Sequence, residues 1–316
     1  MIAAGRLLSV GGLQFRVVQS SLEGRMSRPV FVIVHGIGSS HRYSTRLQDE
    51  LALAGESLSL DLPGFGGMQT PGHPLSIEAY ASMIGRVFDA LHLADAVLIG
   101  HSMGAQIVTE LALQRPELVS HLVLIAPVVD PSRDTLLRQA AALARDSLGE
   151  PLFVKRIALA DTARAGLRWF LRETSPMLAY PLRERLSGVR VPVLVVRGTD
   201  DPIARHEWCA AVAGSVPGTR LVEVRGQRHV VHLTAPRRVA AQILGLVRAT
   251  APGAGASRGG AGIPAAADVA TAAGAQAADG SATAATAEGA SRVAAAATAA
   301  GAAGVEGAHP AEEESR

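Results

Sequence analysis

The feature that most constrains the fold of this chain is a glycine-flanked turn at residues 100–104. A short apolar run at residues 97–99 stops at Gly100, and a helical pattern begins within a residue or two of Ser102. The turn has the pattern Gly-x-Ser-x-Gly, in which glycines are needed because strand and helix nearly touch. Such a turn lifts the serine above a sheet, in a strained backbone conformation, and points the positive end of the helix at it. It therefore predicts a strand followed at once by a helix, with a presented serine between them.

Strand and helix patterns alternate along the first 250 residues. Strands are expected at residues 6–10, 13–19, 29–34, 57–60, 96–100, 119–126, 192–196 and 220–224. Helices are expected at residues 42–54, 76–91, 102–115, 204–213 and 236–249. This alternation predicts a parallel sheet connected by right-handed crossovers. The exception is 130–187, where only helical segments are expected, broken at residues 149–151, 166, 175–176 and 180–181.

The composition changes abruptly near residue 250. From Ala251 to Arg316 the chain is almost entirely Ala, Gly, Thr and Ser, without Leu, Met or an aromatic residue. Such a segment cannot bury enough apolar surface to offset the entropy lost on ordering. We therefore predict one α/β domain at residues 1–250, with a helical cap inserted at about 128–188. Residues 251–316 are predicted to form a disordered, low-complexity tail.

The charge and cysteine content narrow the range of partners. The net charge of +2 comes from 30 basic and 28 acidic residues, and the basic ones are not clustered with aromatic residues. No nucleic-acid partner is therefore expected. The single cysteine, Cys209, excludes a disulfide framework and a cysteine-based metal site. No signal peptide and no apolar run long enough to span a membrane are evident, so we expect a cytoplasmic protein.

Two polar segments that follow predicted strands supply partners for the serine. A serine hydroxyl needs a base to become a nucleophile, and the base needs an acid to orient it. Asp200 and Asp201 follow one strand and His229 follows the next, in the order serine, acid, histidine. Strand ends are where open α/β sheets place their ligands. By spacing alone, Asp200 and Asp201 both remain candidates for the acid.

Taken together, these motifs resemble those of the α/β-hydrolase superfamily over roughly residues 6–248. The matching segments are residues 35–38 (His-Gly-Ile-Gly), 61–66 (Asp-Leu-Pro-Gly-Phe-Gly), 100–104, 198–201 (Gly-Thr-Asp-Asp) and 226–236. The helical insertion resembles the caps of the esterase, C–C hydrolase and proline-iminopeptidase-like branches. The resemblance implies an α/β-hydrolase fold: a mostly parallel, eight-stranded sheet flanked by helices, with a helical cap.

The resemblance also implies a role for each matching residue. Ser102 is expected to be the nucleophile, and His229 the general base. Asp201 is expected to orient the histidine, because the family pattern is Gly-x-x-Asp. The backbone N–H groups of Ile37 and Met103 are expected to form the oxyanion hole. No cofactor and no metal are implied, the expected partner is a small-molecule substrate, and the oligomeric state is left open.

The expected reaction is hydrolysis through a covalent acyl-serine intermediate. The cap is dominated by Leu, Ala and a few aromatic residues, so we expect a carboxylic ester of a small apolar molecule. Two alternatives use the same triad: hydrolysis of a C–C bond in a vinylogous diketone, and acyl transfer to an acceptor other than water. An alternative of another class is a non-catalytic ligand-binding protein with this fold.

Two positions depart from the family pattern. Arg228 stands directly before the predicted catalytic histidine, where the family usually has Gly, and Ala105 stands where a second Gly often follows the turn. Neither change removes a catalytic group. Some members of the superfamily take their acid from an earlier strand end, which makes Asp130 a further candidate. A helix N-cap is the simpler interpretation of Asp130.

The other histidines are expected to have supporting roles. His232 lies three residues after the predicted base, but no third ligand stands at a suitable spacing, so packing is favoured over metal binding. His35 and His101 lie within the motifs, where loop packing or hydrogen bonding is expected. His41 and His73 are expected in surface loops.

Three arginines of the predicted cap repeat every four residues: Arg164, Arg168 and Arg172. On one helix they would share a face, which we expect to be solvated rather than an anion-binding stripe. Leu167, Phe170 and Leu171 would then lie on the buried side. Trp169, Phe170 and Met177 could line a substrate pocket or fill the core of the cap, and the sequence leaves both open.

Overall fold

The computed structural model describes residues 5–20, 29–131 and 136–251. Residues 1–4, 21–28, 132–135 and 252–316 lie outside the described part of the chain. The predicted tail at 251–316 therefore falls outside the described residues except for Ala251, and its disorder stays a prediction.

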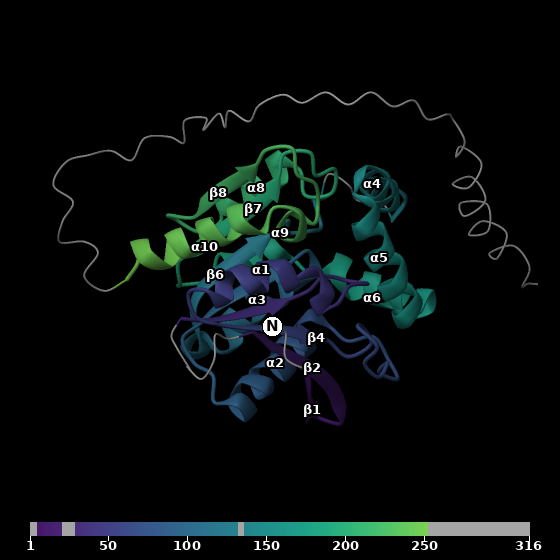
Figure 1. Cartoon of the computed structure of the whole chain (residues 1–316), viewed down its shortest axis with the longest axis horizontal. Coiled ribbons are helices and arrows are strands. Elements are labelled where there is room, and N and C mark those ends of the chain that lie inside the picture. The colour runs from purple at the N-terminus through teal and green to yellow at the C-terminus, as the bar shows by residue number, and fades with distance from the viewer. Residues whose placement is uncertain (1–4, 21–28, 132–135, 252–316) are drawn as a thin grey trace, which may run out of the picture. The chain divides into compact units, whose positions relative to one another are not determined.

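Eight strands in the described residues form one sheet in the order β1-β2-β4-β3-β5-β6-β7-β8 (Figure 1). The strands are β1 (Arg6–Val10), β2 (Leu13–Ser20), β3 (Val30–Val34), β4 (Glu56–Asp61), β5 (Ala96–His101), β6 (Val119–Ile125), β7 (Val193–Gly198) and β8 (Arg220–Val224). β2 pairs antiparallel with β1 and with β4, and all later pairs are parallel. The predicted mostly parallel, eight-stranded sheet is confirmed.

The central strands are apolar on both faces because helices cover both sides of the sheet. β3, β5 and β7 are buried along their whole length. One group of packed helices is α1 (Thr45–Ala52), α9 (Val231–Thr234) and α10 (Pro236–Ala249). A second group is α2 (Ile77–Leu91), α3 (Met103–Gln114), α7 (Leu182–Leu186) and α8 (His206–Ala213). The short 3-10 turn η1 (His41–Tyr43) precedes α1, and the short 3-10 turn η2 (Pro116–Leu118) follows α3.

Local signals in the sequence explain where the helices begin and end. The Ser76 hydroxyl accepts a hydrogen bond from the backbone of Ala79 at 3.2 Å, as expected of an N-cap. α2 ends where His92 adopts a left-handed conformation with φ of 54°. α3 ends just before Pro116, which cannot continue the backbone hydrogen-bond ladder.

The cap consists of α4 (Leu136–Gly149), α5 (Leu152–Ala165) and α6 (Leu167–Ala179), which lie together to one side of the sheet (Figure 1). The expected breaks after Gly149 and at Gly166 are present, but the break expected at Pro176 is wrong, because α6 runs through it. Tertiary contacts hold the helix on both sides of the proline. Glu173 is buried, and the Met177 carbonyl accepts a hydrogen bond from Gln106 at 3.0 Å.

The loops that carry the predicted motifs meet at one edge of the sheet. Residues 35–38 follow β3, residues 61–66 lie at the end of β4, and the turn at 100–104 ends β5. Residues 198–202 follow β7 and residues 226–232 follow β8. Because these five strands run parallel, their carboxyl ends lie side by side, where α/β sheets place their ligands.

Candidate active site

The turn between β5 and α3 holds Ser102 in a strained conformation. Its φ is 56° and its ψ is −121°, a region that non-glycine residues rarely adopt. A Cβ atom on Gly100 would lie 2.3 Å from the Gly104 carbonyl oxygen, and one on Gly104 would lie 2.3 Å from the Val34 carbonyl oxygen. Both glycines are therefore required by close backbone contact, as the sequence pattern predicted.

His229 and Asp201 form a buried pair at the same edge of the sheet. His229 Nδ1 lies 2.9 Å from Asp201 Oδ2. The other carboxylate oxygen, Oδ1, accepts hydrogen bonds from the backbone N–H groups of Ile203 at 2.7 Å and Ala204 at 3.0 Å. Asp200, by contrast, is exposed to solvent. Of the two adjacent aspartates, the structure thus places Asp201 against the histidine.

The electrostatics of this pair favour a charged carboxylate and a basic imidazole. Burial alone would raise the pKa of Asp201, but the charge and hydrogen bond of His229 and the two backbone donors outweigh it and lower that pKa. Burial also disfavours the imidazolium of His229. The negative charge of Asp201, with its hydrogen bond, outweighs this effect and raises the pKa of His229.

Ser102 and His229 are linked through the residue next to the serine. His101 Nε2 lies 3.1 Å from the His229 carbonyl oxygen, and the two imidazole rings have centroids 4.9 Å apart. Among the described residues, no direct hydrogen bond joins the Ser102 hydroxyl to the His229 ring. Catalytic hydrogen bonds are often long before a substrate binds.

The loop after β3 packs directly on the serine. A Cβ atom on Gly36 would lie 2.8 Å from the Ser102 Cβ atom and 3.3 Å from its hydroxyl oxygen. Ile37 is the next residue of this loop, and the Ser39 hydroxyl holds the loop by donating to the Gly36 carbonyl at 2.9 Å. Met103 is the first residue of α3 and is buried. Ile37 and Met103 thus flank the serine, and their role as oxyanion donors stays a prediction.

Asp130, the further candidate for the acid, has a different partner. Its Oδ2 atom accepts a hydrogen bond from Arg205 Nε at 2.8 Å. The carboxylate that contacts the His229 ring is that of Asp201 instead.

His35 and His101 have the expected roles in hydrogen bonding within the loops. His35 Nδ1 donates to the Gly36 carbonyl at 2.7 Å, and its Nε2 accepts from the Leu62 backbone at 3.2 Å. His232 packs against His101 with ring centroids 4.2 Å apart. Both ring nitrogens of His232 are buried without a hydrogen-bond partner, and this burial lowers its pKa to about 3. His232 is therefore a neutral packing residue.

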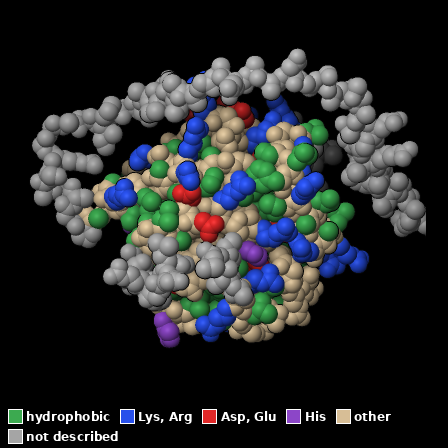
Figure 2. Space-filling view, in the orientation of Figure 1, with side chains coloured by type: hydrophobic (Ala, Val, Ile, Leu, Met, Phe, Trp, Pro, Cys, Tyr) green, Lys and Arg blue, Asp and Glu red, His purple; other side chains and the backbone are tan. Residues whose placement is uncertain are grey.

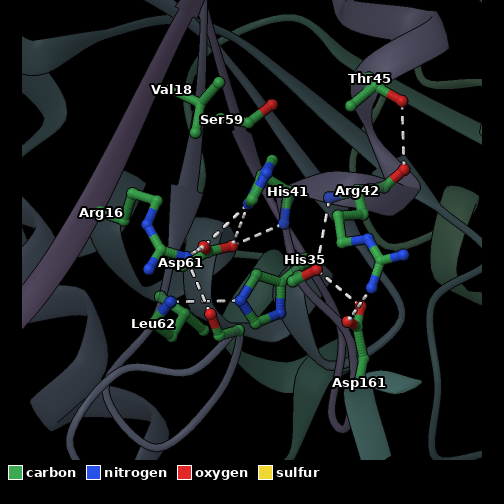
Figure 3. A network of polar contacts seen from close by, with 12 residues as sticks. Arg16, Val18, His35, His41, Arg42, Thr45, Ser59, Asp61, Leu62 and Asp161 are labelled. Carbon is green, nitrogen blue, oxygen red and sulfur yellow. Dashed lines mark hydrogen bonds and ion pairs between the residues drawn. The ribbon is translucent and has the colours of Figure 1, made fainter. Parts of the chain in front are cut away.

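The expectation that His41 lies in a surface loop is wrong (Figure 3). Asp61 is the last residue of β4 and is fully buried, so its carboxylate requires hydrogen-bond donors. His41 Nδ1 and Arg16 Nη1 supply them, at 2.8 and 2.7 Å from its Oδ2 atom. The adjacent Arg42 donates to Asp161 of α5 at 3.0 Å, which ties this loop to the cap. His73 is exposed, as expected.

The expected buried side of the cap is wrong for Leu167 and Leu171, whereas Phe170 is half-buried. Gly166 separates α5 from α6, so Arg164 does not share a helix with Arg168 and Arg172, although all three are exposed as expected. The break changes which residues of α6 face inward. Leu167 and Leu171 are 61 and 55% exposed, and the buried residues of α6 are instead those at positions 169 and 173.

The two aromatic residues of α6 cover the motif loops. A Cβ atom on Gly64 would lie 2.1 Å from Trp169 Nε1, and one on Gly38 would lie 2.8 Å from the Phe170 ring. Trp169 is buried and belongs to the main core, so its core interpretation is confirmed. Phe170 is half-buried against the loop that carries the predicted oxyanion donor. Met177 packs between two core clusters.

Two buried carboxylates of α4 and its following turn face the histidine loop, and the sequence analysis missed both. Asp146 Oδ1 accepts a hydrogen bond from the His229 backbone at 3.3 Å. Burial raises the pKa of Glu150 to about 7, and the charge of Asp146 adds to this effect. Arg228 Nη1 donates to the Arg145 carbonyl at 3.3 Å and lies 3.9 Å from Asp146. The only sequence signal was a pair of acids four residues apart, which does not reveal what they face.

Two negative observations apply to the described residues only. No group of three or more His, Cys, Asp or Glu side chains in them is arranged to hold a metal ion. None of their helices has both the length and the apolar character that crossing a bilayer requires.

Comparison with known proteins identifies one family and relatives that are named as hydrolases. Residues 31–242 match the model of a family described as the alpha/beta hydrolase family. A curated relative, (E)-2-((N-methylformamido)methylene)succinate hydrolase of Acinetobacter baylyi, is 24% identical over 227 residues, which cover 66% of this chain and 86% of the relative.

Two solved structures share the fold. An E-2-(acetamidomethylene)succinate hydrolase superposes with a TM-score of 0.64 and 22% identity over 78% of this chain and 99% of its own. A carboxylesterase of Bacillus subtilis superposes with a TM-score of 0.64 and 18% identity over 77% of this chain and 91% of its own.

Proposed function

The chain belongs to the alpha/beta hydrolase family, and from this premise we propose that it is a serine hydrolase with the triad Ser102, His229 and Asp201. The substrate proposed is a carboxylic ester of a small apolar molecule. The observation that carries the proposal is the buried pair of His229 and Asp201, 2.9 Å apart, beside a serine held with φ of 56°. A strained, presented serine next to an oriented imidazole is the arrangement that acyl transfer requires.

The reaction proceeds in two half-reactions. His229 Nε2 removes the proton from the Ser102 hydroxyl, whose oxygen attacks the ester carbonyl carbon. The resulting oxyanion accepts hydrogen bonds from the N–H groups of Ile37 and Met103. The tetrahedral intermediate collapses, His229 passes its proton to the leaving alkoxide, and an alcohol departs. Water then gives a proton to His229 and attacks the acyl-serine, which releases the acid and restores the serine.

Asp201 acts in this scheme through the histidine. Its carboxylate accepts the Nδ1 proton of His229, which leaves Nε2 free to accept the serine proton. The lowered pKa of Asp201 keeps the carboxylate charged, so that it stabilises the imidazolium formed in each half-reaction. The half-buried Phe170 beside the loop at residues 35–38 supports an apolar acyl or alcohol group in the substrate.

A second candidate is cleavage of an N-acyl compound. It is favoured by the relative and the solved structure that are named as hydrolases of amidomethylene succinates. The same triad would attack the acyl carbonyl, and an amine would leave in place of an alcohol.

Hydrolysis of a chain-length series of p-nitrophenyl esters tests the proposal, with wild type beside Ser102→Ala. Labelling by phenylmethylsulfonyl fluoride is read by mass spectrometry. We expect turnover that is lost in the variant and a label on Ser102. A label without ester turnover would favour the N-acyl substrates, C–C hydrolysis or acyl transfer to another acceptor. If neither turnover nor a label is observed, the serine hydrolase proposal is contradicted and a ligand-binding protein is favoured.

A further inference from the structure

The cap helices and the turns between them carry most of the exposed large apolar side chains of the described chain. Eight such side chains are exposed in the described residues, and six of them lie between residues 142 and 179. These six are leucines with exposed fractions from 44 to 75%: Leu143, Leu148, Leu152, Leu159, Leu167 and Leu171. A single exposed leucine is common, but a set confined to three consecutive helices indicates an interaction surface.

In the same segment, the acidic side chains are buried, whereas most of the basic side chains are exposed. The four acidic side chains described between residues 142 and 179 are all buried: Asp146, Glu150, Asp161 and Glu173. Five basic side chains there are exposed: Arg145, Arg156, Arg164, Arg168 and Arg172. We call the six exposed leucines and these five arginines the cap surface. Among its described residues it presents positive charge and apolar groups without an exposed acid.

Leucine and arginine lie next to each other along the helices. On α6, Leu167 and Leu171 form one exposed stripe, and Arg168 and Arg172 form the adjacent one. On α5, Arg156 lies on the same stripe as the exposed Leu152, four residues before it, and the exposed Leu159, three residues after it. Figure 2 shows hydrophobic and basic side chains intermingled over the region that holds the cap helices in Figure 1.

We propose that the cap surface docks on an anionic lipid surface. Leucine side chains gain free energy when they enter the boundary between head groups and acyl chains. Arginine guanidinium groups bind lipid phosphates through paired hydrogen bonds and are attracted by the negative surface potential. A helical surface with both groups and without exposed acids matches an anionic bilayer in charge and in polarity.

Two other occupants fit the cap surface less well. A second copy of the chain, packed through the same surface, would place arginines opposite arginines, and this repulsion opposes association. A single-stranded nucleic acid would need exposed aromatic rings for base stacking. Trp169 is buried, and Phe153 and Phe170 are only half-exposed.

Docking at this position would bring lipid close to the proposed nucleophile. α6 carries part of the cap surface, and its Phe170 packs on Gly38, two residues from the loop position that contacts Ser102. The lipid and the serine would thus be separated by about one helix diameter, roughly 10 Å. We infer a substrate class from this: acyl esters that partition into lipid. This second statement rests on the proposed esterase function, whereas the docking itself does not.

Sedimentation with lipid vesicles tests the docking on the full chain. The probe is phosphatidylcholine vesicles with and without phosphatidylglycerol, and the protein is the Ser102→Ala variant, so that turnover plays no part. We expect binding to the anionic vesicles only, weakened by added salt because salt screens the charges. Binding that ignores phosphatidylglycerol would overturn the proposal, whatever the outcome of the esterase assay.

Arginine variants test whether the cap surface is the part that binds. Each arginine near an anionic bilayer contributes about a fivefold increase in partitioning, so Arg168→Gln with Arg172→Gln is expected to weaken binding about 25-fold. The matched control is Arg237→Gln with Arg238→Gln, two exposed arginines of α10, which is expected to change binding less than twofold. Equal losses in the two double variants would contradict docking through the cap.

Leucine variants distinguish lipid docking from self-association. Leu167→Ser with Leu171→Ser is expected to weaken vesicle binding at least tenfold, whereas Leu53→Ser, which changes a leucine that is 69% exposed outside the cap, leaves it unchanged. Light scattering measures the oligomeric state in parallel. A dimer that dissociates in the cap variant, with no vesicle binding by the wild type, would show that the occupant is a second copy and that the proposal is wrong.

Discussion

Replacing Asp146 by asparagine should make His229, the proposed general base, less basic. Asp146 is 5% exposed, and its Oδ1 atom accepts the backbone hydrogen bond of His229 at 3.3 Å. Asparagine keeps an oxygen that can accept this bond but removes the negative charge. Because that charge raises the pKa of His229, its loss lowers this pKa. The acid limb of the kcat/KM profile should therefore move to lower pH, and the variant should keep more activity in acid.

The size of the shift follows from the position of the carboxylate. The Asp146 carboxylate binds the His229 backbone N–H, so one side-chain length separates it from the ring, a distance on the order of 7 Å. At an effective dielectric constant of about 40, two unit charges at that separation interact by about 1 kcal/mol. One pKa unit corresponds to about 1.4 kcal/mol, so we expect the acid limb to move by about half to one pH unit. Glu150→Gln should move it in the same direction but by less, because a carboxyl group with a pKa of about 7 is partly protonated over the acid limb.

Glu173 provides a matched control within the same cap. It is also buried, burial raises its pKa to about 7, and it accepts a backbone hydrogen bond from the main domain, but from Leu75 at 2.9 Å. Glu173→Gln should leave the acid limb in place. Steady-state kinetics between about pH 5 and 9 measure both variants, and NMR titration of the His229 ring reports its pKa directly. An unmoved limb in Asp146→Asn, or an equal shift in Glu173→Gln, would refute the electrostatic argument.

Three further predictions concern the proposed triad and the core. Asp201→Asn should lower kcat by about 10⁴-fold, because the histidine loses the partner that fixes its tautomer, whereas Asp200→Asn should stay close to wild type in the same ester assay. Gly100→Ala should lower the free energy of unfolding by about 3 kcal/mol or prevent folding, since its Cβ would lie 2.3 Å from a carbonyl oxygen. Gly72→Ala, with open space at its Cβ position, should unfold at an unchanged urea concentration. Glu110→Gln removes the buried charge that the partly exposed guanidinium of Arg185 binds at 2.8 Å. It should lower the free energy of unfolding by about 1 to 3 kcal/mol in the same urea titration.

Short-range patterns in the sequence were sufficient to predict the sheet and the residues at its edge. Buried parallel strands leave continuous apolar runs, and a Gly-x-Ser-x-Gly turn requires glycines wherever backbone meets backbone, as Gly100 and Gly104 show. The order of Ser102, Asp201 and His229 along the chain follows from the topology of such a sheet. These features depend on contacts within one or two neighbouring elements, so the sequence alone carries them.

The errors concern contacts between distant segments. Pro176 stays helical because the main domain holds α6 on both sides of it. His41 is drawn inward because Asp61, buried at the end of a strand 20 residues later, needs donors. Asp146 reaches the histidine loop only because α4 docks there. None of these outcomes can be read from local periodicity, since each depends on which surface the folded chain brings near.

The contact between Gly149 and Arg228 has an evolutionary consequence. The Arg228 guanidinium occupies the space that a Cβ atom on Gly149 would fill, with a separation of only 1.9 Å. A side chain at 149 therefore requires the flexible Arg228 side chain to move aside, and it fits most easily where residue 228 is small. Residues larger than glycine at 149 should therefore be more frequent among homologues that carry a small residue at 228.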